Sequence, residues 1–298
     1  MSANISSITS EIDAIIAKAM EEYTAAKGVS VLQPEVPEVL EDIQESEPAA
    51  PPAIPVNSDS ILVSEETSRF SGAVWFDKIQ EKTVTLAGLG GIGSYVAFLL
   101  GRLHPEAVYL YDDDVVEAGN LSGQLYSKNN IGSRKAHATN SILNAFADYY
   151  NSSYYIERFT QASTATQIMM CGFDNMQARR TFFMRWKELV NACNEEDKKN
   201  CLFIDGRLAA ESFQVLCIKG DDMFSRMRYE KEFLFSDEEA EETICSYKQT
   251  SFMANMIASV MVNLFVNFCA NQCDPLVPRD LPFFTEYNGE TMFFKVIA

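Results

Sequence analysis

A glycine-rich turn constrains the fold of this 298-residue chain more than any other feature. The letters GLGGIG at residues 88–93 follow an apolar run, TVTLA at 83–87, and lead into residues 92–103, whose apolar side chains recur with helical spacing. Glycine allows a sharp turn and a close phosphate approach, and the following helix start offers free N–H groups. The pattern predicts a strand–turn–helix unit that binds a nucleotide. Its candidate ligands are Gly88, Gly90, Gly91 and Gly93.

Strands and helices alternate from about Arg69 onward. Apolar strands in β-α-β order predict a parallel sheet covered on both faces. Two further strands flank Asn288-Gly289, which predicts a hairpin with a tight turn. We therefore expect an α/β fold, a Rossmann-like mixed and mainly parallel sheet with helices on both faces. The predicted strands are 83–87, 107–111, 154–159, 168–171, 201–205, 213–219, 283–287 and 291–296, and the predicted helices are 92–103, 134–149, 176–192 and 251–270.

Residues 1–60 differ in composition from the rest of the chain. Residues 10–26 have the apolar spacing of a short amphipathic helix. Residues 31–60 contain seven acidic residues, several prolines and no Lys or Arg. Such a segment buries too little apolar surface to offset its chain entropy, which predicts a disordered acidic arm. We expect residues 61–298 to form the folded domain, with the arm as either a plain tether or a tethered docking helix.

Charge and composition exclude several classes of function. The formal net charge is −18, and such a surface repels the phosphates of nucleic acids. The longest apolar stretch, 253–269, is interrupted by Asn and Ser, which favours a core helix over a membrane span. No secretory signal opens the chain, so we expect a cytoplasmic protein. The seven cysteines include no C-x-x-C pair, and we expect no zinc.

Further motifs follow the glycine turn in a fixed order. Asp112 ends the second predicted strand, where a dinucleotide enzyme places its ribose-binding acid, and alone it favours a nicotinamide or flavin enzyme. The run DDDVVEAGNLSGQ at 112–124, then GSRKA at 132–136 and CGFDN at 171–175 with Arg179, changes that expectation. This series resembles the ThiF/MoeB/HesA family, the bacterial relatives of ubiquitin-activating enzymes. The likeness covers roughly residues 69–271 and disfavours an NAD-dependent oxidoreductase.

The resemblance implies an enzyme that uses ATP and Mg²⁺ to adenylate a carboxylate. The expected substrate is the C-terminus of a small β-grasp carrier protein that ends in glycine, such as a ubiquitin-like or sulfur-carrier protein. A homodimer is also implied. The implied roles are ribose binding by Asp112, phosphate binding by Asn120, Gln124 and Lys135, magnesium coordination and catalysis by Asp174, and further nucleotide contacts by Asp114, Asn175 and Arg179.

Simpler interpretations of single residues stay open. Asp112 and Asp114 are also typical of a turn, and Lys135 of an exposed helix position. Asp174-Asn175 is also typical of a helix N-cap. Cys245, just before the last predicted helix, is a candidate catalytic thiol by the resemblance or a buried structural cysteine.

The chain lacks two arginines that the family pattern contains. Gly123 stands where the pattern has an arginine, and upstream only Arg69 of two expected arginines is present. Arg134 or Arg69 are candidates to compensate. Losing a cationic donor weakens transition-state stabilisation. The alternatives are therefore a degenerate nucleotide-binding or assembly protein without efficient turnover, or an enzyme that adenylates a peptide or small-molecule carboxylate.

Overall fold

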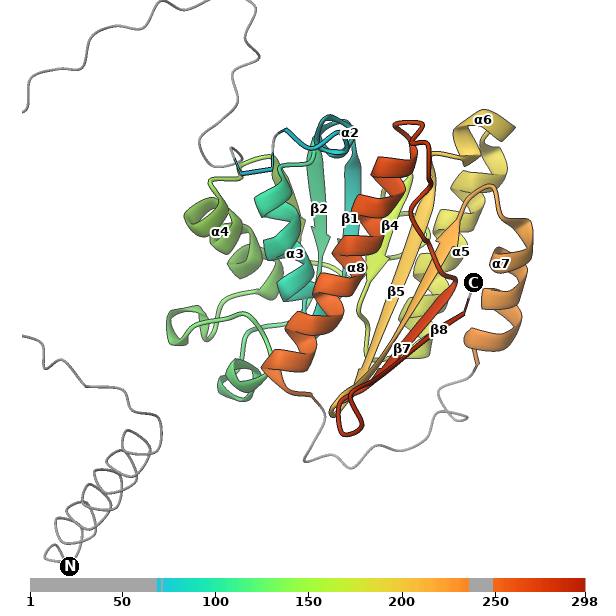
Figure 1. Ribbon diagram of the computed structural model, residues 1–298. Helices are drawn as coiled ribbons and strands as arrows, with labels where there is room; N and C mark the ends of the chain where they lie inside the picture. Colours follow the sequence, from blue (N-terminus) through green and yellow to red (C-terminus); the bar gives the residue numbers. More distant parts are fainter. Residues whose placement is uncertain (1–68, 71, 236–248, 298) are drawn as a thin grey trace, which may run out of the picture. The chain divides into compact units, whose positions relative to one another are not determined.

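The computed structural model describes residues 69–70, 72–235 and 249–297. The predicted helix and acidic linker within residues 1–60 lie outside them, and so does Cys245. The described residues form one eight-stranded sheet with helices packed on both faces (Figure 1). The predicted Rossmann-like α/β fold is confirmed.

The sheet is parallel in its first half and antiparallel in its second. The strand order is β3-β2-β1-β4-β5-β6-β7-β8. All pairings from β3 to β5 are parallel, and all pairings from β5 to β8 are antiparallel. The strands are β1 (Thr83–Ala87), β2 (Ala107–Tyr111), β3 (Ser152–Tyr155), β4 (Ile168–Cys171), β5 (Leu202–Ala209), β6 (Ser212–Lys219), β7 (Phe284–Asn288) and β8 (Phe293–Ile297).

Helices cover the two faces of the sheet in two groups. In Figure 1, α3, α4 and α8 lie on the near face, α5 lies behind the strands, and α7 lies at the right of the picture. The α-helices are α2 (Phe76–Gln80), α3 (Gly91–Leu103), α4 (Lys135–Ala147), α5 (Met176–Ala192), α6 (Glu195–Lys198), α7 (Met223–Arg228) and α8 (Ser251–Asn271). Three further helical turns are η2 (Ala118–Ser122), η3 (Lys128–Asn130) and η4 (Tyr229–Phe233).

Each central strand contributes to two hydrophobic cores. Successive side chains of a strand point to opposite faces, so a strand buried on both sides is apolar along its whole length. Leu86 of β1 belongs to the core under α3, α4 and α8, whereas its neighbour Ala87 belongs to the core under α5. The second core is rich in aromatic rings and includes Phe182, Phe183 and Trp186 of α5.

The long helix α8 is a core element of the sheet. Its mean hydropathy of 1.7 and its 21 residues meet the criteria for a membrane span, and 56% of the apolar window is buried inside the domain. Residues such as Ile257, Met261 and Phe265 are fully buried in the core that α8 shares with α3. Asn255, Ser259 and Asn263 interrupt the apolar sequence on the exposed side of the helix. The helix therefore has the burial expected of a core helix.

The order in which strands are added to the sheet reverses between β1 and β4. From β1 it proceeds outward to β2 and β3, and it then returns to β4 on the other side of β1. The connections after β1 and after β4 therefore diverge to opposite sides, which leaves a crevice at the carboxyl ends of these two strands. This crevice is where an open α/β sheet binds its ligands.

The predicted strand at 154–159 was wrong in its bounds. The observed strand β3 spans Ser152–Tyr155 and pairs with β2 only as far as Tyr111. At that point β2 ends and the chain turns into the aspartate run, so residues 156–159 find no partner strand. Residues 157–159 line the cavity described below.

The predicted tight Asn-Gly turn was also wrong, although the hairpin exists. Asn288 pairs with Phe293, so the loop has four residues rather than two. Asn288 Oδ1 accepts a hydrogen bond from the Thr291 N–H at 3.0 Å. Gly289 is required for a close approach, because a Cβ there would lie 2.6 Å from the Glu211 carbonyl oxygen. Met292 has the positive φ of 53° in this loop.

Candidate functional site

The glycine loop, residues 88–93, begins the site at the carboxyl end of β1. Gly88 has a φ of +79°, a left-handed conformation that favours glycine. A Cβ at Gly88 would lie 3.0 Å from Phe173 Cδ1, and a Cβ at Gly93 would lie 1.9 Å from the Gly88 carbonyl oxygen. A side chain at Gly88 would therefore push the glycine loop away from the loop after β4, and one at Gly93 would push α3 away from the glycine loop. The loop leads into α3, whose first N–H groups have no intrahelical partner.

Asp112 connects the end of β2 to the glycine loop. One carboxylate oxygen accepts a hydrogen bond from the Leu89 N–H at 2.7 Å, and the other accepts from the Asp114 N–H at 2.8 Å. Burial raises the pKa of Asp112, while these two N–H groups and the Lys135 cation oppose that rise. Each carboxylate oxygen has a second lone pair. Asp112 can therefore accept a further hydrogen bond from a ligand hydroxyl.

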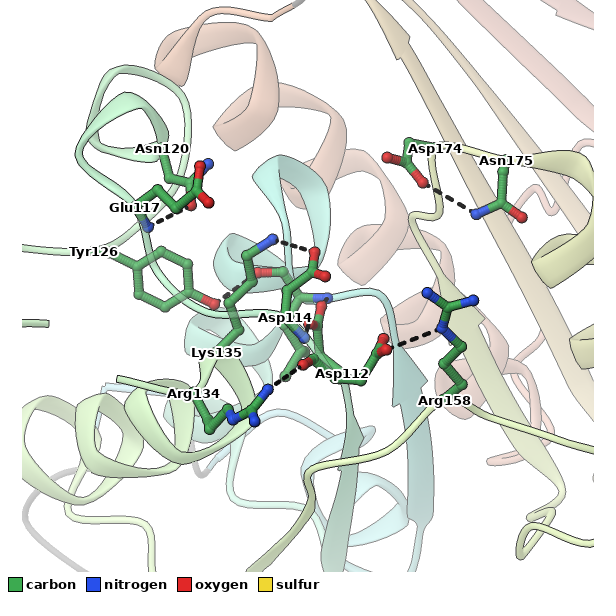
Figure 2. Close-up of polar contacts among 12 residues, drawn as sticks. Asp112, Asp114, Glu117, Asn120, Tyr126, Arg134, Lys135, Arg158, Asp174 and Asn175 are labelled. Carbon is green, nitrogen blue, oxygen red and sulfur yellow. Dashed lines mark hydrogen bonds and ion pairs between the residues drawn. The ribbon is translucent and has the colours of Figure 1, made fainter. Parts of the chain in front are cut away.

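Lys135 brings a positive charge to the same place. It is the first residue of α4, and its side chain is only 9% exposed. Its ammonium group donates to Asp114 Oδ2 at 2.8 Å, and Figure 2 shows the two groups pointing toward each other. The alternative that Lys135 is an ordinary exposed helix residue is therefore wrong.

Asp174 and Asn175 follow β4 and differ in what they contact. Asn175 is the N-cap of α5, because its Oδ1 accepts from the Ala178 N–H at 2.8 Å. Asp174 is exposed, and its Oδ1 accepts from the Asn175 side-chain amide at 3.1 Å (Figure 2). Among the described residues Asp174 has no ion pair with a Lys or Arg, so its carboxylate is available to a ligand.

These groups line one cavity of about 710 Å³ at the crevice between β1 and β4. Ligand pockets of proteins typically enclose roughly 300–1,000 Å³, so this cavity has room for a nucleotide. The sequence-predicted residues that line it are Gly88, Gly90, Gly91, Asp112, Asp114, Gln124, Lys135, Asp174 and Asn175.

Comparison with known proteins supports a family assignment. The sequence model of the ThiF family matches residues 64–298, which is most of the chain. The chain belongs to the ThiF family.

Characterised relatives of this ThiF-family chain are similar over part of their length. The ubiquitin-like modifier-activating enzyme 5 of Caenorhabditis elegans is 28% identical over 139 residues, covering 41% of this chain and 32% of that protein. The enzyme of the same name from Arabidopsis thaliana is 29% identical over 106 residues, covering 36% of this chain and 23% of that protein. The matched part therefore spans about a third or less of these relatives.

Solved structures share the fold of this ThiF-family chain. PaaA aligns with a TM-score of 0.61 at 14% identity, covering 81% of this chain and 77% of PaaA. Escherichia coli MccB, solved with ATP, aligns with a TM-score of 0.55 at 14% identity, covering 78% of this chain and 71% of MccB.

Three sequence-predicted residues of the ThiF-family site lie outside the cavity lining: Gly93, Asn120 and Arg179. Asn120 lies in η2 and forms a reciprocal cap with Glu117. Figure 2 shows one of its bonds, from the Glu117 N–H to Asn120 Oδ1. Arg179 is buried and donates to the Asp205 carboxylate and to the Phe173 carbonyl oxygen. Arg179 therefore supports the loop that carries Asp174.

Gln124 lines the cavity and has an unsatisfied acceptor atom. The residue is 8% exposed, and its Oε1 atom is buried without a hydrogen-bond partner. A buried acceptor without a partner costs free energy, so such groups are nearly always satisfied. A phosphate carries only acceptors at neutral pH. A phosphate oxygen therefore cannot satisfy the Gln124 oxygen, and only a donor group can.

Arg158 and Gln249 are among the lining residues that were not predicted from the sequence. Arg158, in the segment after β3, is 83% exposed and forms an ion pair with Asp113 at 2.9 Å. Arg134, proposed from the sequence as a compensating cation, instead donates to the Asp113 carbonyl oxygen outside the lining. Gln249, just before α8, faces Gly123 and Gly91. No local motif marks either Arg158 or Gln249.

Proposed function

We propose that this chain is an ATP-dependent adenylyltransferase that activates the C-terminal carboxylate of a ubiquitin-like protein or peptide. One observation carries the proposal. The glycine loop, Lys135 and the exposed Asp174 carboxylate line a single cavity at the crevice between β1 and β4. Membership of the ThiF family supports the same reaction class.

Adenylation places specific demands on such a site. A carboxylate oxygen of the substrate attacks the α-phosphorus of ATP, the bond from that phosphorus to the bridging oxygen breaks, and pyrophosphate leaves. Negative charge on the phosphate oxygens must be met by preorganised donors and cations. The start of α3 supplies N–H groups, and Lys135 supplies a cation held in place by Asp114. Asp112 and Gln124 are suited to hold the ribose and base.

Asp174 has the chemistry expected of a magnesium ligand. Mg²⁺ prefers carboxylate and phosphate oxygens, and when bound it would neutralise charge on the phosphates. Asp112, Asp113 and Asp114 also bring carboxylate oxygens within 4.8 Å of one another. Lys135 and Arg158 already form ion pairs with two of these aspartates. We therefore assign the magnesium contact to Asp174.

The substrate class rests on the relatives. Two sequence relatives are named as enzymes that activate a ubiquitin-like modifier, and MccB has been solved in complex with MccA. A cavity of about 710 Å³ accommodates a nucleotide but not a folded protein. We propose that only the C-terminal tail of the partner enters the cavity, beside the α-phosphate.

Pyrophosphate exchange tests the proposal. The protein with ATP, Mg²⁺ and a candidate carrier should incorporate labelled pyrophosphate into ATP. Asp174→Asn keeps the side-chain size but removes the charge, and should lower the exchange rate on the order of 10²-fold. Asp77→Ala, at an exposed position of α2 outside the cavity, is the matched control and should exchange normally. Exchange that survives Asp174→Asn unchanged would exclude this site.

A second candidate function is nucleotide binding without turnover. The specific observation concerns Gly123, which stands where the family pattern has an arginine. The neutral side chain of Gln249 lies against this glycine, so this position supplies no cation to the site. Tight ATP binding by calorimetry, without pyrophosphate exchange for any carrier offered, would favour this function over the enzyme.

A further part of the proposal concerns Cys245. We propose that the Cys245 thiol accepts the activated acyl group, with its sulfur bonding to the acyl carbon as AMP leaves. Cys245→Ala should then keep pyrophosphate exchange but lose any hydroxylamine-sensitive adduct with the carrier.

We also propose a homodimer, which analytical ultracentrifugation of the full chain tests directly.

A further inference from the structure

Gln249 lies at the glycine loop although it belongs to a different part of the chain. It directly precedes Thr250, the N-cap of α8, and forms a backbone bridge with Ala210. A Cβ at Gly91 would lie 2.0 Å from Gln249 Oε1 and 2.9 Å from its Cδ. The Gln249 amide therefore occupies the space that any side chain at residue 91 would fill, at the first residue of α3.

Gly123 leaves room for the same side chain. A Cβ at Gly123 would lie 2.9 Å from Gln249 Cγ and 3.2 Å from its Cδ and Nε2. Gly123 has a negative φ of −129°, so a left-handed backbone is not what requires glycine here. The close approach of Gln249 requires it. Gly91 and Gly123, from two separate segments, thus form a slot that holds the Gln249 amide.

The amide in this slot has unused hydrogen-bonding capacity. It lines the cavity and makes no hydrogen bond to another described residue. A carboxamide offers two N–H donors, and a phosphate offers only acceptors at neutral pH. The start of a helix is also where phosphates bind most readily in this kind of fold.

We propose that Gln249 is a phosphate-binding residue of this site, which donates a side-chain N–H to a phosphate oxygen of ATP from the slot between Gly91 and Gly123. The inference rests on the proposed function, because it requires that ATP occupy the cavity. It adds a residue from the α8 end of the chain to the nucleotide site.

The first test compares ligands with and without phosphates. Gln249→Ala should weaken ATP binding about tenfold or more in calorimetry with Mg²⁺, as expected for a lost hydrogen bond to a charged group. The affinity for adenosine, measured by competition, should not change because adenosine has no phosphate. Gln272→Ala at the other end of α8 is the matched control and should bind ATP like the wild type.

The second test uses the slot itself. Gly123→Ala adds one methyl group that displaces Gln249, and should weaken ATP binding several-fold. In a Gln249→Ala background the same change should have no further effect, because no side chain remains to be displaced. Gly119→Ala is the matched control, since a Cβ at that position meets no atom within 4 Å.

The outcomes separate this inference from the proposed function. A wild-type chain that binds no ATP removes both. Wild-type binding together with an unchanged Gln249→Ala variant overturns only the role of Gln249. Equal losses for ATP and adenosine, or an effect of Gly123→Ala that is the same in both backgrounds, would assign Gln249 a structural role and also overturn it. Circular dichroism melting of each variant without nucleotide verifies that the fold is intact.

Discussion

Tyr126 positions the glycine loop through its phenol group. The buried hydroxyl donates to the Leu89 carbonyl oxygen at 2.7 Å and lies 3.1 Å from the Thr139 hydroxyl of α4. Burial raises the pKa of Tyr126 well above its usual value, so the phenol keeps its proton throughout the neutral range. A single hydroxyl thus joins the glycine loop to the helix that carries Lys135.

Tyr126→Phe should therefore affect both stability and binding. Removing the hydroxyl should cost about 1 kcal/mol of unfolding free energy, since the Leu89 carbonyl loses its partner in a buried place. ATP affinity should fall a few-fold because the loop is less well held. Urea denaturation and calorimetry measure the two effects.

Tyr149→Phe provides the comparison for that prediction. Tyr149 is also buried, and its hydroxyl proton is shared between the Pro105 and Asn151 carbonyl oxygens, 2.9 and 3.0 Å away and outside the cavity. This variant should lose similar stability with unchanged ATP affinity. If both variants bind ATP equally well, Tyr126 does not act through the loop.

Asp205 joins several elements through one buried carboxylate. It lies on β5 and is 0% exposed. It accepts hydrogen bonds from Arg179 of α5, from Arg207 Nε at 2.8 Å and from the Tyr229 hydroxyl of η4 at 2.9 Å. The Cys171 thiol of β4 lies 3.4 Å away. Burial raises the pKa of both Tyr229 and Cys171, so both remain protonated donors to this carboxylate.

Asp205→Ala should destabilise the domain by roughly 3–5 kcal/mol, because it leaves Arg179 buried without its counter-ion. Glu188→Ala removes the partner of an exposed ion pair on the same helix α5, with a distance of 3.5 Å to Arg185, and should change stability by less than about 0.5 kcal/mol. Chemical denaturation of both variants measures the difference. Similar losses for the two variants would contradict a special role for Asp205.

The whole domain should lose stability at alkaline pH. Burial raises the pKa of the Cys217 and Cys269 thiols from 9.0 to about 12. Both residues lie in the core, with exposures of 4% and 0%. Because their folded-state pKa values exceed the unfolded value, their contribution to stability is complete below pH 9. This contribution is lost as the pH rises from 9 toward 12, because in that range unfolding releases the thiol protons.

Each such thiol should lower the unfolding free energy by up to about 1.4 kcal/mol per pH unit within this window. Urea denaturation under reducing conditions at several values between pH 8 and 10.5 should therefore show a steepening decline. Replacing both cysteines with alanine should make the decline shallower. A stability that stays constant up to pH 10.5 would contradict these burial effects.

The sequence by itself determined the strands β1, β2 and β4 and the position of the glycine loop. The strands 83–87, 107–111 and 168–171 match their predicted bounds, because a short apolar run between turn residues is a local signal. The chain order of the motifs also placed Lys135 and Asp174 near the same strand ends. Strand 154–159 failed because its extent depends on where its neighbour β2 ends, and that is not local information.

Only the tertiary structure decided what the remaining side chains contact. Arg179 is paired with a buried aspartate of another strand, and Asn120 caps a short helical turn, although both matched motif positions. Gln249 meets Gly91 and Gly123 across more than a hundred residues of sequence. Such contacts form when the packing of α8 on α3 brings distant segments together, and no residue spacing within either segment encodes them.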